Sequence, residues 1–195
     1  MQKQNNEINR LFEESSKIIF DSIILHKEIE SSIQLILKSL SKGKKIVTMG
    51  NGGSAMDAQH MASEFIGRYL IERKSIPSIS LTSDSAILTA LGNDYGFDTI
   101  FKRQCESLIQ PGDVVIAIST SGKSKNILDG IKMAKKKRAK IIGLTGKTGG
   151  KMTPYCDILI KSPSNETPRI QESHRIIIHI ICELVEKSVK QLKSK

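Results

Sequence analysis

The feature that most constrains the fold is the alternation of short apolar runs with helical segments from Gly43 onward. Five runs rich in Ile, Val and Leu predict strands: residues 45–49, 76–82, 113–119, 140–146 and 156–161. Helices are expected between them at 54–70, 84–91, 98–109 and 124–138, with a final long helix at about 172–192. Strands that are apolar on both faces and separated by helices are typical of a parallel sheet covered on both sides. We therefore expect a doubly wound α/β domain with a five-stranded parallel sheet flanked by helices.

The first forty residues follow a different pattern. Apolar residues recur there at three- and four-residue steps, which predicts helix with a break near Ser15 or His26. Some of these residues, such as Ile18, Ile19 and Leu25, fall on more than one face, so we expect burial on two sides and an oligomer. At 195 residues the chain predicts one domain, with residues 1–42 as helices used in oligomer packing and 43–195 as the α/β core.

Composition narrows the classes of partner. The net charge is +10, but the densest basic run, 135–138, closes a predicted helix, and aromatic residues (4%) do not interleave with the basic ones. We therefore expect a solvated basic face and no nucleic-acid partner. The chain has no signal-peptide pattern and no apolar window near the roughly 18 residues of a membrane span. Three widely spaced cysteines fit a reducing compartment, so we expect a cytoplasmic protein without a membrane partner.

The exit of the first predicted strand reads "GNGGSA", which formally matches a dinucleotide-binding fingerprint. That fingerprint also requires an acid about 20 residues later, at the end of the second strand. Here the residues near position 70 are "YLIERK" and still precede the second predicted strand. A dinucleotide site is therefore disfavoured.

The exit of the third predicted strand reads "ISTSGKSKN". A nucleotide-binding loop needs a glycine five residues before the Gly-Lys pair, but Ala117 stands there, and Ile141 stands before the other Gly-Lys pair. What remains is four hydroxyls at a helix N-terminus, where free N–H groups favour a single phosphate: Ser119, Thr120, Ser121 and Ser124. The alternative, an N-cap with a turn, would account for one or two of the four.

Two further groups contain candidate proton carriers or metal ligands. His60 and Glu64 are four residues apart and share one helical face. They could be a solvated surface pair, but Met61 and Phe65 beside them place the pair near buried surface. His179 lies in an otherwise apolar helix, where a buried histidine with a satisfied nitrogen is the commoner interpretation, and the polar Gln171 lies near the expected start of that helix.

Taken together, these pieces resemble the sugar isomerase (SIS) domain family and, within it, the phosphoheptose isomerases. Five motifs in family order carry the resemblance: "GNGGSAMDAQHMASEFIGRY", "LGNDYGFDTIF", "PGDVVIAISTSGKSKNI", "LTGKTGGKM" and "RIQESHRIIIH". The resemblance implies an aldose–ketose isomerase that converts sedoheptulose 7-phosphate to D-glycero-D-manno-heptose 7-phosphate. It also implies a homotetramer and one zinc ion per subunit.

The resemblance also implies residue roles. Glu64 and His179 match the acid–base pair, and the metal ligands match His60, Glu64, Gln171 and His179. Family residues that contact the sugar match Asn51, Gly52, Gly53, His60, Glu64, Asn93, Asp94 and Gln171, with Asn93 and Asp94 expected in the loop after the second strand. Family phosphate contacts match Ser119, Thr120, Ser121 and Ser124.

One departure and two alternatives remain. Many family members have an acid shortly before "RIQE", whereas this chain has Thr167 and Pro168 there, with Glu166 the nearest carboxylate, so we expect an altered substrate contact. Non-catalytic relatives that bind the replication initiator lack the acid–base pair, and this chain retains both Glu64 and His179. An isomerase for another ketose phosphate is the second alternative.

The spacing of two predicted ligands raises a geometric question. If Gln171 and His179 are both helical, they lie about 12 Å apart along the axis and about 80° apart around it. Both could reach one ion without strain only if Gln171 precedes the helix or a ligand comes from another chain. We therefore expect the site near a subunit boundary.

Overall fold

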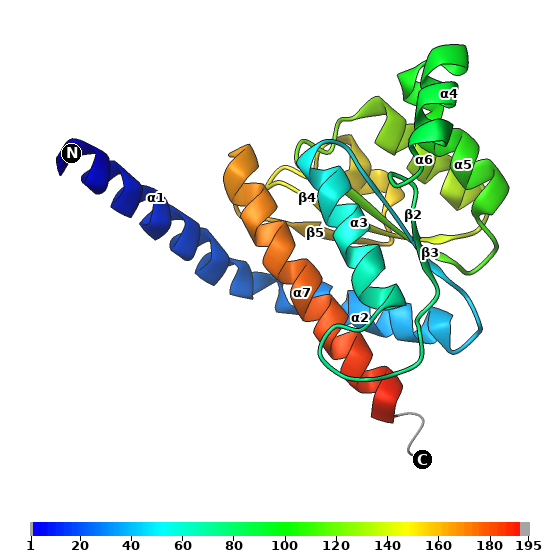
Figure 1. Cartoon of the computed structure of the whole chain (residues 1–195), viewed down its shortest axis with the longest axis horizontal. Helices are drawn as coiled ribbons and strands as arrows, with labels where there is room; N and C mark the ends of the chain where they lie inside the picture. Colours follow the sequence, from blue (N-terminus) through cyan, green and yellow to red (C-terminus); the bar gives the residue numbers. More distant parts are fainter. Residues whose placement is uncertain (1, 192–195) are drawn as a thin grey trace.

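A single parallel sheet organises the computed structural model, which describes residues 2–191 (Figure 1). Its five strands are β1 (Ile46–Gly50), β2 (Ser78–Ser80), β3 (Val114–Ser119), β4 (Lys140–Thr145) and β5 (Ile158–Lys161). They are ordered β2-β1-β3-β4-β5, and every neighbouring pair is parallel. All five strands were predicted, as was the doubly wound parallel sheet.

Helices cover both faces of the sheet, and β1 and β3 are therefore buried along their whole length. One hydrophobic cluster packs α2, α3 and α7 against one face, and a second packs α5 and α6 against the other. The bounds of the helices after β1 are α3 (Gly53–Ile66), α4 (Ser85–Tyr95), η2 (Phe97–Thr99), α5 (Ile100–Leu108), α6 (Lys125–Lys136), η3 (Gly150–Tyr155) and α7 (Thr167–Gln191).

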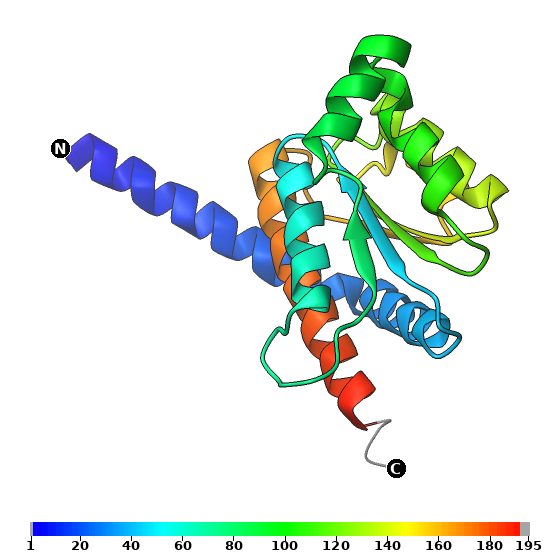
Figure 2. The same ribbon diagram turned by 45° about the vertical axis from the view of Figure 1, so that its right-hand side comes forward.

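The N-terminal segment forms two helices, α1 (Gln2–Asp21) and α2 (His26–Leu40), joined by the 3₁₀ turn η1 (Ser22–Leu25). The break predicted near His26 is therefore confirmed, whereas the alternative break at Ser15 is wrong because α1 runs through it. α2 packs on the sheet side of α7, while α1 projects away from the domain (Figures 1 and 2). Where α1 meets α7, Ser15 donates a hydrogen bond to the Glu172 carboxylate at 3.0 Å.

Several helix boundaries differ from the prediction. α7 begins at Thr167 rather than near residue 172, since Pro168 lies in the first turn, where a helix needs no N–H donor. Gln171 is therefore inside α7, and the prediction that it could precede the helix is wrong. α4 continues to Tyr95, so the loop predicted for Asn93 and Asp94 is a helical turn. α3 ends at Ile66 instead of residue 70, and Leu192, predicted to end α7, is outside the described residues.

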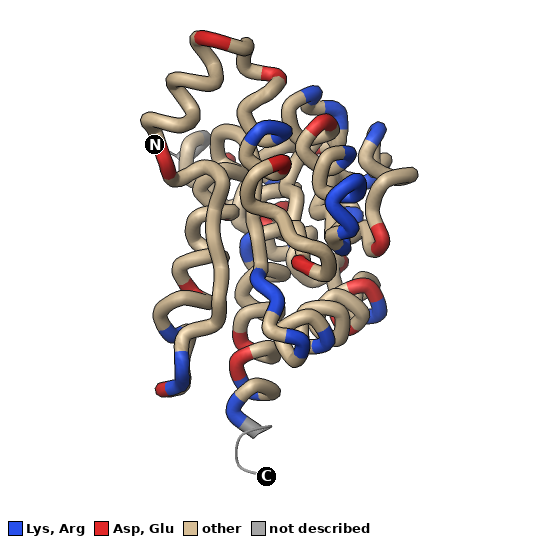
Figure 3. Tube along the Cα trace, turned by 90° about the vertical axis from the view of Figure 1, so that its right-hand side faces the viewer, with Lys and Arg blue, Asp and Glu red and all other residues tan. Residues whose placement is uncertain are grey.

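Basic positions are spread over several elements of the described chain, with acidic positions among them (Figure 3). On α6, for example, Lys125 contacts Asp98 at 3.3 Å and Asp129 at 2.9 Å. Within residues 2–191, none of the helices combines the length and the apolar character that crossing a membrane requires.

Candidate active site

The candidate site lies at the carboxyl ends of β1 and β3, which are neighbours in the sheet although β2 lies between them in sequence. The chain leaves β1 for α3 on one face and leaves β3 for α6 on the other face. This divergence opens a crevice above the sheet, which is where ligands bind in doubly wound folds.

The turn after β1 requires glycine at positions 50 and 52 and leaves little room for a side chain at position 53. Gly52 has a positive φ of 55°, a conformation that other residues rarely adopt. A Cβ at Gly50 would overlap the Ser54 carbonyl, and one at Gly53 would overlap the Gln171 side chain. Glycine thus lets the backbone turn sharply into α3 and lets Gln171 of α7 approach the turn.

The turn after β3 carries the predicted phosphate hydroxyls. The Ser119 and Ser124 hydroxyls are 3.3 Å apart, and Gly122 between them has φ of 60°. Ser124 occupies the N-cap of α6, but its side chain makes no capping hydrogen bond. Ser121 accepts a hydrogen bond from the Lys123 N–H at 3.2 Å, as a turn residue does. The N-cap interpretation therefore does not account for the Ser124 hydroxyl.

The two turns meet around a cavity of about 310 Å³. A reciprocal pair of hydrogen bonds joins the turns, because each amide of Asn51 and Asn126 donates to the other at 2.9 Å. Asn126 is 3% exposed and also accepts a hydrogen bond from the Ile127 N–H at 2.9 Å. Sequence reasoning missed Asn126, whose signal was a buried amide in the first turn of α6. The lining residues are Asn51, Gly52, Gly53, Ser54, Ile118, Ser119, Thr120, Ser124, Thr167 and Gln171.

The candidate proton carriers meet where α3 and α7 cross. Nε2 of His60 lies 2.9 Å from Nε2 of His179, although 119 residues separate them in sequence. Nε2 of His60 also lies 3.6 Å from the Glu64 carboxylate. The side chains of His60 and Glu64 are 30% and 21% exposed, whereas Met61 and Phe65 are fully buried. The pair lies at the edge of the core, which favours the buried-surface interpretation over a solvated pair.

The surroundings of His179 lower its pKa, first by burial and then by the nearby His60. The ring of Tyr69 packs beside it, with centroids 5.7 Å apart. His179 is only half-buried, so the commoner interpretation of a satisfied core histidine does not describe it. His174 is the core histidine of this helix: it is fully buried, its Nε2 contacts the Thr145 carbonyl at 3.1 Å while Nδ1 has no partner in the described part of the chain, and burial lowers its pKa to about 4.

An ion pair between a buried aspartate and a partly exposed arginine lies beside the histidines and was not predicted. Asp57 on α3 contacts the Arg175 guanidinium on α7 at 2.6 Å, and its carboxylate is almost fully buried. Burial raises the pKa of Asp57 despite this partner. A signal existed in the sequence, because Asp57 precedes His60 by three residues and so shares its helical face.

A second cavity of about 630 Å³ adjoins the first at Gly53 and Gln171, since both residues line both cavities, whereas His60 and Glu64 line neither. His179, Asp57 and Arg175 lie on the second cavity. Thr167 and Pro168, which stand where many family members have an acid, also lie at these cavities: Thr167 lines the first and Pro168 the second. The arrangement suits an elongated ligand with an anionic end at the serine turn and a reactive end near the histidines.

Asn93 and Asp94 lie apart from these cavities, exposed in the last turn of α4. The Asn93 amide donates to the Asp94 carboxylate at 2.8 Å. Their predicted contact with a sugar stays a prediction.

The donor types at the histidine end fit a divalent metal ion. Two imidazoles and a carboxylate are a ligand set that catalytic zinc sites use, and Gln171 adds an amide oxygen on the cavity that His179 lines. In residues 2–191, however, no three His, Cys, Asp or Glu side chains are already placed as metal ligands. His60 and His179 are hydrogen-bonded to each other instead.

Comparison with known proteins decides the family. A family model for the SIS domain matches residues 12–146. A phosphoheptose isomerase of Campylobacter concisus is 48% identical over 94% of this chain and 97% of its own. The chain belongs to the phosphoheptose isomerase family of SIS-domain proteins. The phosphoheptose isomerase of Pelobacter propionicus is 52% identical over 79% of this chain and 82% of its own.

Solved structures of the phosphoheptose isomerase family share the fold. The enzyme from Neisseria gonorrhoeae superposes with a TM-score of 0.89 at 37% identity, covering 94% of this chain and 99% of that one. The enzyme from Francisella tularensis gives 0.91 at 34% identity, covering 94% and 98%. The family resemblance in the sequence is thus confirmed, while the roles of individual residues stay predictions.

Proposed function

We propose that the chain is an aldose–ketose isomerase that converts sedoheptulose 7-phosphate to D-glycero-D-manno-heptose 7-phosphate, the first step of nucleotide-activated heptose biosynthesis. One observation carries the proposal: a hydroxyl-rich turn and His179 line adjoining cavities that share Gly53 and Gln171, and His60 and Glu64 lie next to His179. Similarity to phosphoheptose isomerases over most of the chain supports this substrate.

The serine turn would hold the phosphate. Ser119, Thr120 and Ser124 line the smaller cavity at the N-terminus of α6, where free N–H groups and the helix dipole favour an anion. Ser121 would add a contact through its hydroxyl or backbone. Anchoring the phosphate would fix the position of the carbon chain along the two cavities.

Proton transfer would take place at the other end. Isomerisation moves a proton between C1 and C2 through an enediol, and a positioned general base contributes typically 10²–10⁴-fold to such a step. Glu64 would carry the proton between the carbons. His179 would move protons at the oxygens or assist ring opening, and its half-buried position keeps it in reach of the cavity.

Zinc would be held by His60, Glu64, Gln171 and His179, and when bound it would polarise the substrate carbonyl. The lengthwise separation of Gln171 and His179 on α7 leaves a role for a ligand from another chain. Treatment with a chelator should lower kcat and leave the melting temperature of the domain nearly unchanged if the ion serves the reaction. The opposite result would assign the ion a structural role. In that case chelation would lower the melting temperature strongly, and reconstitution with other divalent ions would restore an unchanged kcat.

Sugar contacts would come from Asn51, Gly52 and Gly53 at the glycine turn, together with His60, Glu64 and Gln171. The Asn51 amide is engaged with Asn126, so its free lone pair and the backbone of the turn are the groups available to a hydroxyl. Asn93 and Asp94 would reach a sugar through a shift of α4 or from a neighbouring subunit.

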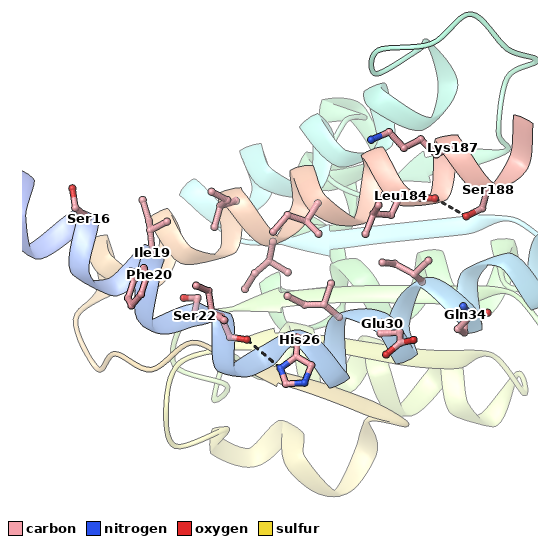
Figure 4. Close-up of a pocket in the computed structure, with 16 residues that line it drawn as sticks. Ser16, Ile19, Phe20, Ser22, His26, Glu30, Gln34, Leu184, Lys187 and Ser188 are labelled. Carbon is pink, nitrogen blue, oxygen red and sulfur yellow. Dashed lines mark hydrogen bonds between the residues drawn. The ribbon is translucent and has the colours of Figure 1, made fainter.

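A homotetramer would cover the apolar surface of the N-terminal helices. Phe12, Phe20 and Ile24 are 71%, 72% and 68% exposed, which is unusual for an isolated domain. An apolar groove of about 1080 Å³ lies beside them between α1–α2 and α7 (Figure 4). Replacing Phe20 with Glu should shift the mass measured by light scattering toward smaller species, whereas an active wild-type monomer would contradict the assembly.

The decisive experiment is a coupled assay with sedoheptulose 7-phosphate, fructose 6-phosphate and ribulose 5-phosphate side by side. The proposal predicts turnover of the first far above the other two. Turnover of none would identify a binding protein, and a preference for one of the others would identify a different isomerase.

A further inference from the structure

The loop between α3 and β2 is held by a buried ion pair outside the candidate site. The side chains of Arg73 and Glu186 are 3% and 1% exposed, and Nε of Arg73 lies 3.0 Å from the Glu186 carboxylate. Figures 1 and 2 show this loop passing beside the C-terminal half of α7, the helix that carries Glu186. A buried pair of this kind is stable only when its remaining donors and acceptors are also satisfied.

Both partners satisfy that condition with backbone groups. The Glu186 carboxylate accepts hydrogen bonds from the N–H groups of Tyr69, Leu70 and Ile71 at 2.7–2.9 Å. Burial raises the pKa of Glu186, but these donors and Arg73 outweigh it, so the pKa lies below its ordinary value. The carboxylate therefore stays charged and fixes three consecutive residues of the loop.

The guanidinium of Arg73 holds the end of α3. It donates to the carbonyls of Glu64, Phe65 and Gly67 at 2.7, 2.9 and 3.1 Å. Carbonyls in the last turn of a helix have no partner within the helix, so an arginine there keeps the turn from fraying. The turn that Arg73 secures is the one that carries Glu64.

The same loop presents the ring of Tyr69 to His179, 5.7 Å between centroids. One ion pair thus sets two positions at once, that of Glu64 through the helix end and that of Tyr69 through the loop. We propose that Arg73 and Glu186 are positioning residues for the isomerase chemistry, aligning Glu64 and the Tyr69 ring with His179. The proposal rests on the proposed function, in which Glu64 and His179 move the protons.

The first test compares two buried carboxylates in the variants Glu186→Gln and Asp113→Asn. Asp113 is equally buried, contacts Lys45 Nζ at 2.5 Å and accepts from the N–H groups of Lys45 and Gln110, but it lies at the amino end of β3, away from the site. Both variants should melt at lower temperature.

Only Glu186→Gln should lower kcat, by about 10²-fold, because small misplacements of reacting groups reduce rates by that order. KM should change little, since the serine turn is untouched. Equal kcat values for Glu186→Gln and wild type, with both folded, would overturn the proposal.

A second pair of variants covers the case in which Glu186→Gln does not fold. Tyr69→Leu removes the half-buried ring and should lower kcat several-fold, while the conservative Tyr69→Phe keeps the ring and should restore most of kcat. Loss of activity in Tyr69→Phe equal to that in Tyr69→Leu would contradict a positioning role for the ring.

A spectroscopic measurement separates this proposal from the function on which it rests. The chain has four histidines, so a protein labelled with ¹³C in its histidine rings gives few signals. Tyr69→Leu and Glu186→Gln should move the signals of His60 and His179 and leave those of His26 and His174 in place, with or without turnover of any sugar phosphate. Unmoved His179 signals would refute the alignment even if the isomerase activity is confirmed.

Discussion

The two ends of the site are built in different ways. At the phosphate end, the glycine turn after β1 and the serine turn after β3 lie on adjacent strands and are joined by the reciprocal amides of Asn51 and Asn126. At the histidine end, His60 and Glu64 on α3 meet His179 on α7, brought together only by the packing of two helices. At the first end each turn has its own local backbone geometry and only the pairing of the turns is tertiary, whereas the second end exists only through tertiary packing.

This difference predicts a separation of effects. Groups at the phosphate end would bind the substrate equally in the ground state and the transition state, so their loss should raise KM. Groups at the histidine end would act on charge and protons that develop only in the transition state, so their loss should lower kcat. Variants at the two ends test whether the molecule divides the work in this way.

The largest effect is expected from Glu64→Gln, which keeps the shape of the side chain and removes the base. We expect kcat to fall by about 10²–10⁴-fold with a much smaller change in KM, because the glutamine amide can keep a contact to a sugar hydroxyl. Initial rates over a range of sedoheptulose 7-phosphate concentrations measure both constants. Normal turnover by this variant would exclude Glu64 as the proton carrier.

A smaller effect is expected from Ser124→Ala, which removes a hydroxyl that no capping bond engages. A hydrogen bond to a charged group contributes about 1.5–3 kcal/mol, so KM should rise roughly 10- to 100-fold while kcat is retained. Ser121→Ala is the comparison within the same turn and should raise KM less, because the backbone of Ser121 can keep a contact after its hydroxyl is lost. If Ser124→Ala lowers kcat and leaves KM unchanged, the assignment of this end to phosphate binding fails.

The smallest effect is expected from Asn126→Ala, which acts on the substrate only through Asn51. Leaving the Asn51 amide without its partner should lower the free energy of unfolding by about 1–3 kcal/mol and raise KM a few-fold. Denaturant unfolding and steady-state kinetics measure the two. In the double variant with Asn51→Ala the losses should be less than additive, since both changes remove the same pair. Additive losses would show that the two amides act independently.

Much of the fold could be predicted from the sequence because its signals are local. Apolar runs on both faces predicted β1 and β3, and both strands are buried along their whole length. The serine turn could likewise be predicted, since its glycine and hydroxyls are contiguous in the chain. Boundaries were less accurate where a tertiary contact decides them: α3 ends at Ile66, where Arg73 takes up its last carbonyls.

The parts that could not be predicted depend on partners distant in sequence. Asn126, Arg175 and Glu186 look like ordinary polar helix residues, and only their contacts with Asn51, Asp57 and Arg73 distinguish them. His179 and His174 stand five residues apart in one helix, and periodicity alone does not say which of them faces the core. The resemblance to a family singled out His179, and in the structure its contact with His60 distinguishes it from His174.

The junction of the two cavities at Gly53 and Gln171 would act as a ruler for the ligand. If the serine turn holds the phosphate, the carbons of a sugar phosphate would extend past this junction before its carbonyl reached His179. The length of the carbon chain would thereby be measured independently of the pattern of hydroxyls, and a shorter ketose phosphate, once anchored, would stop short of the groups that rearrange it.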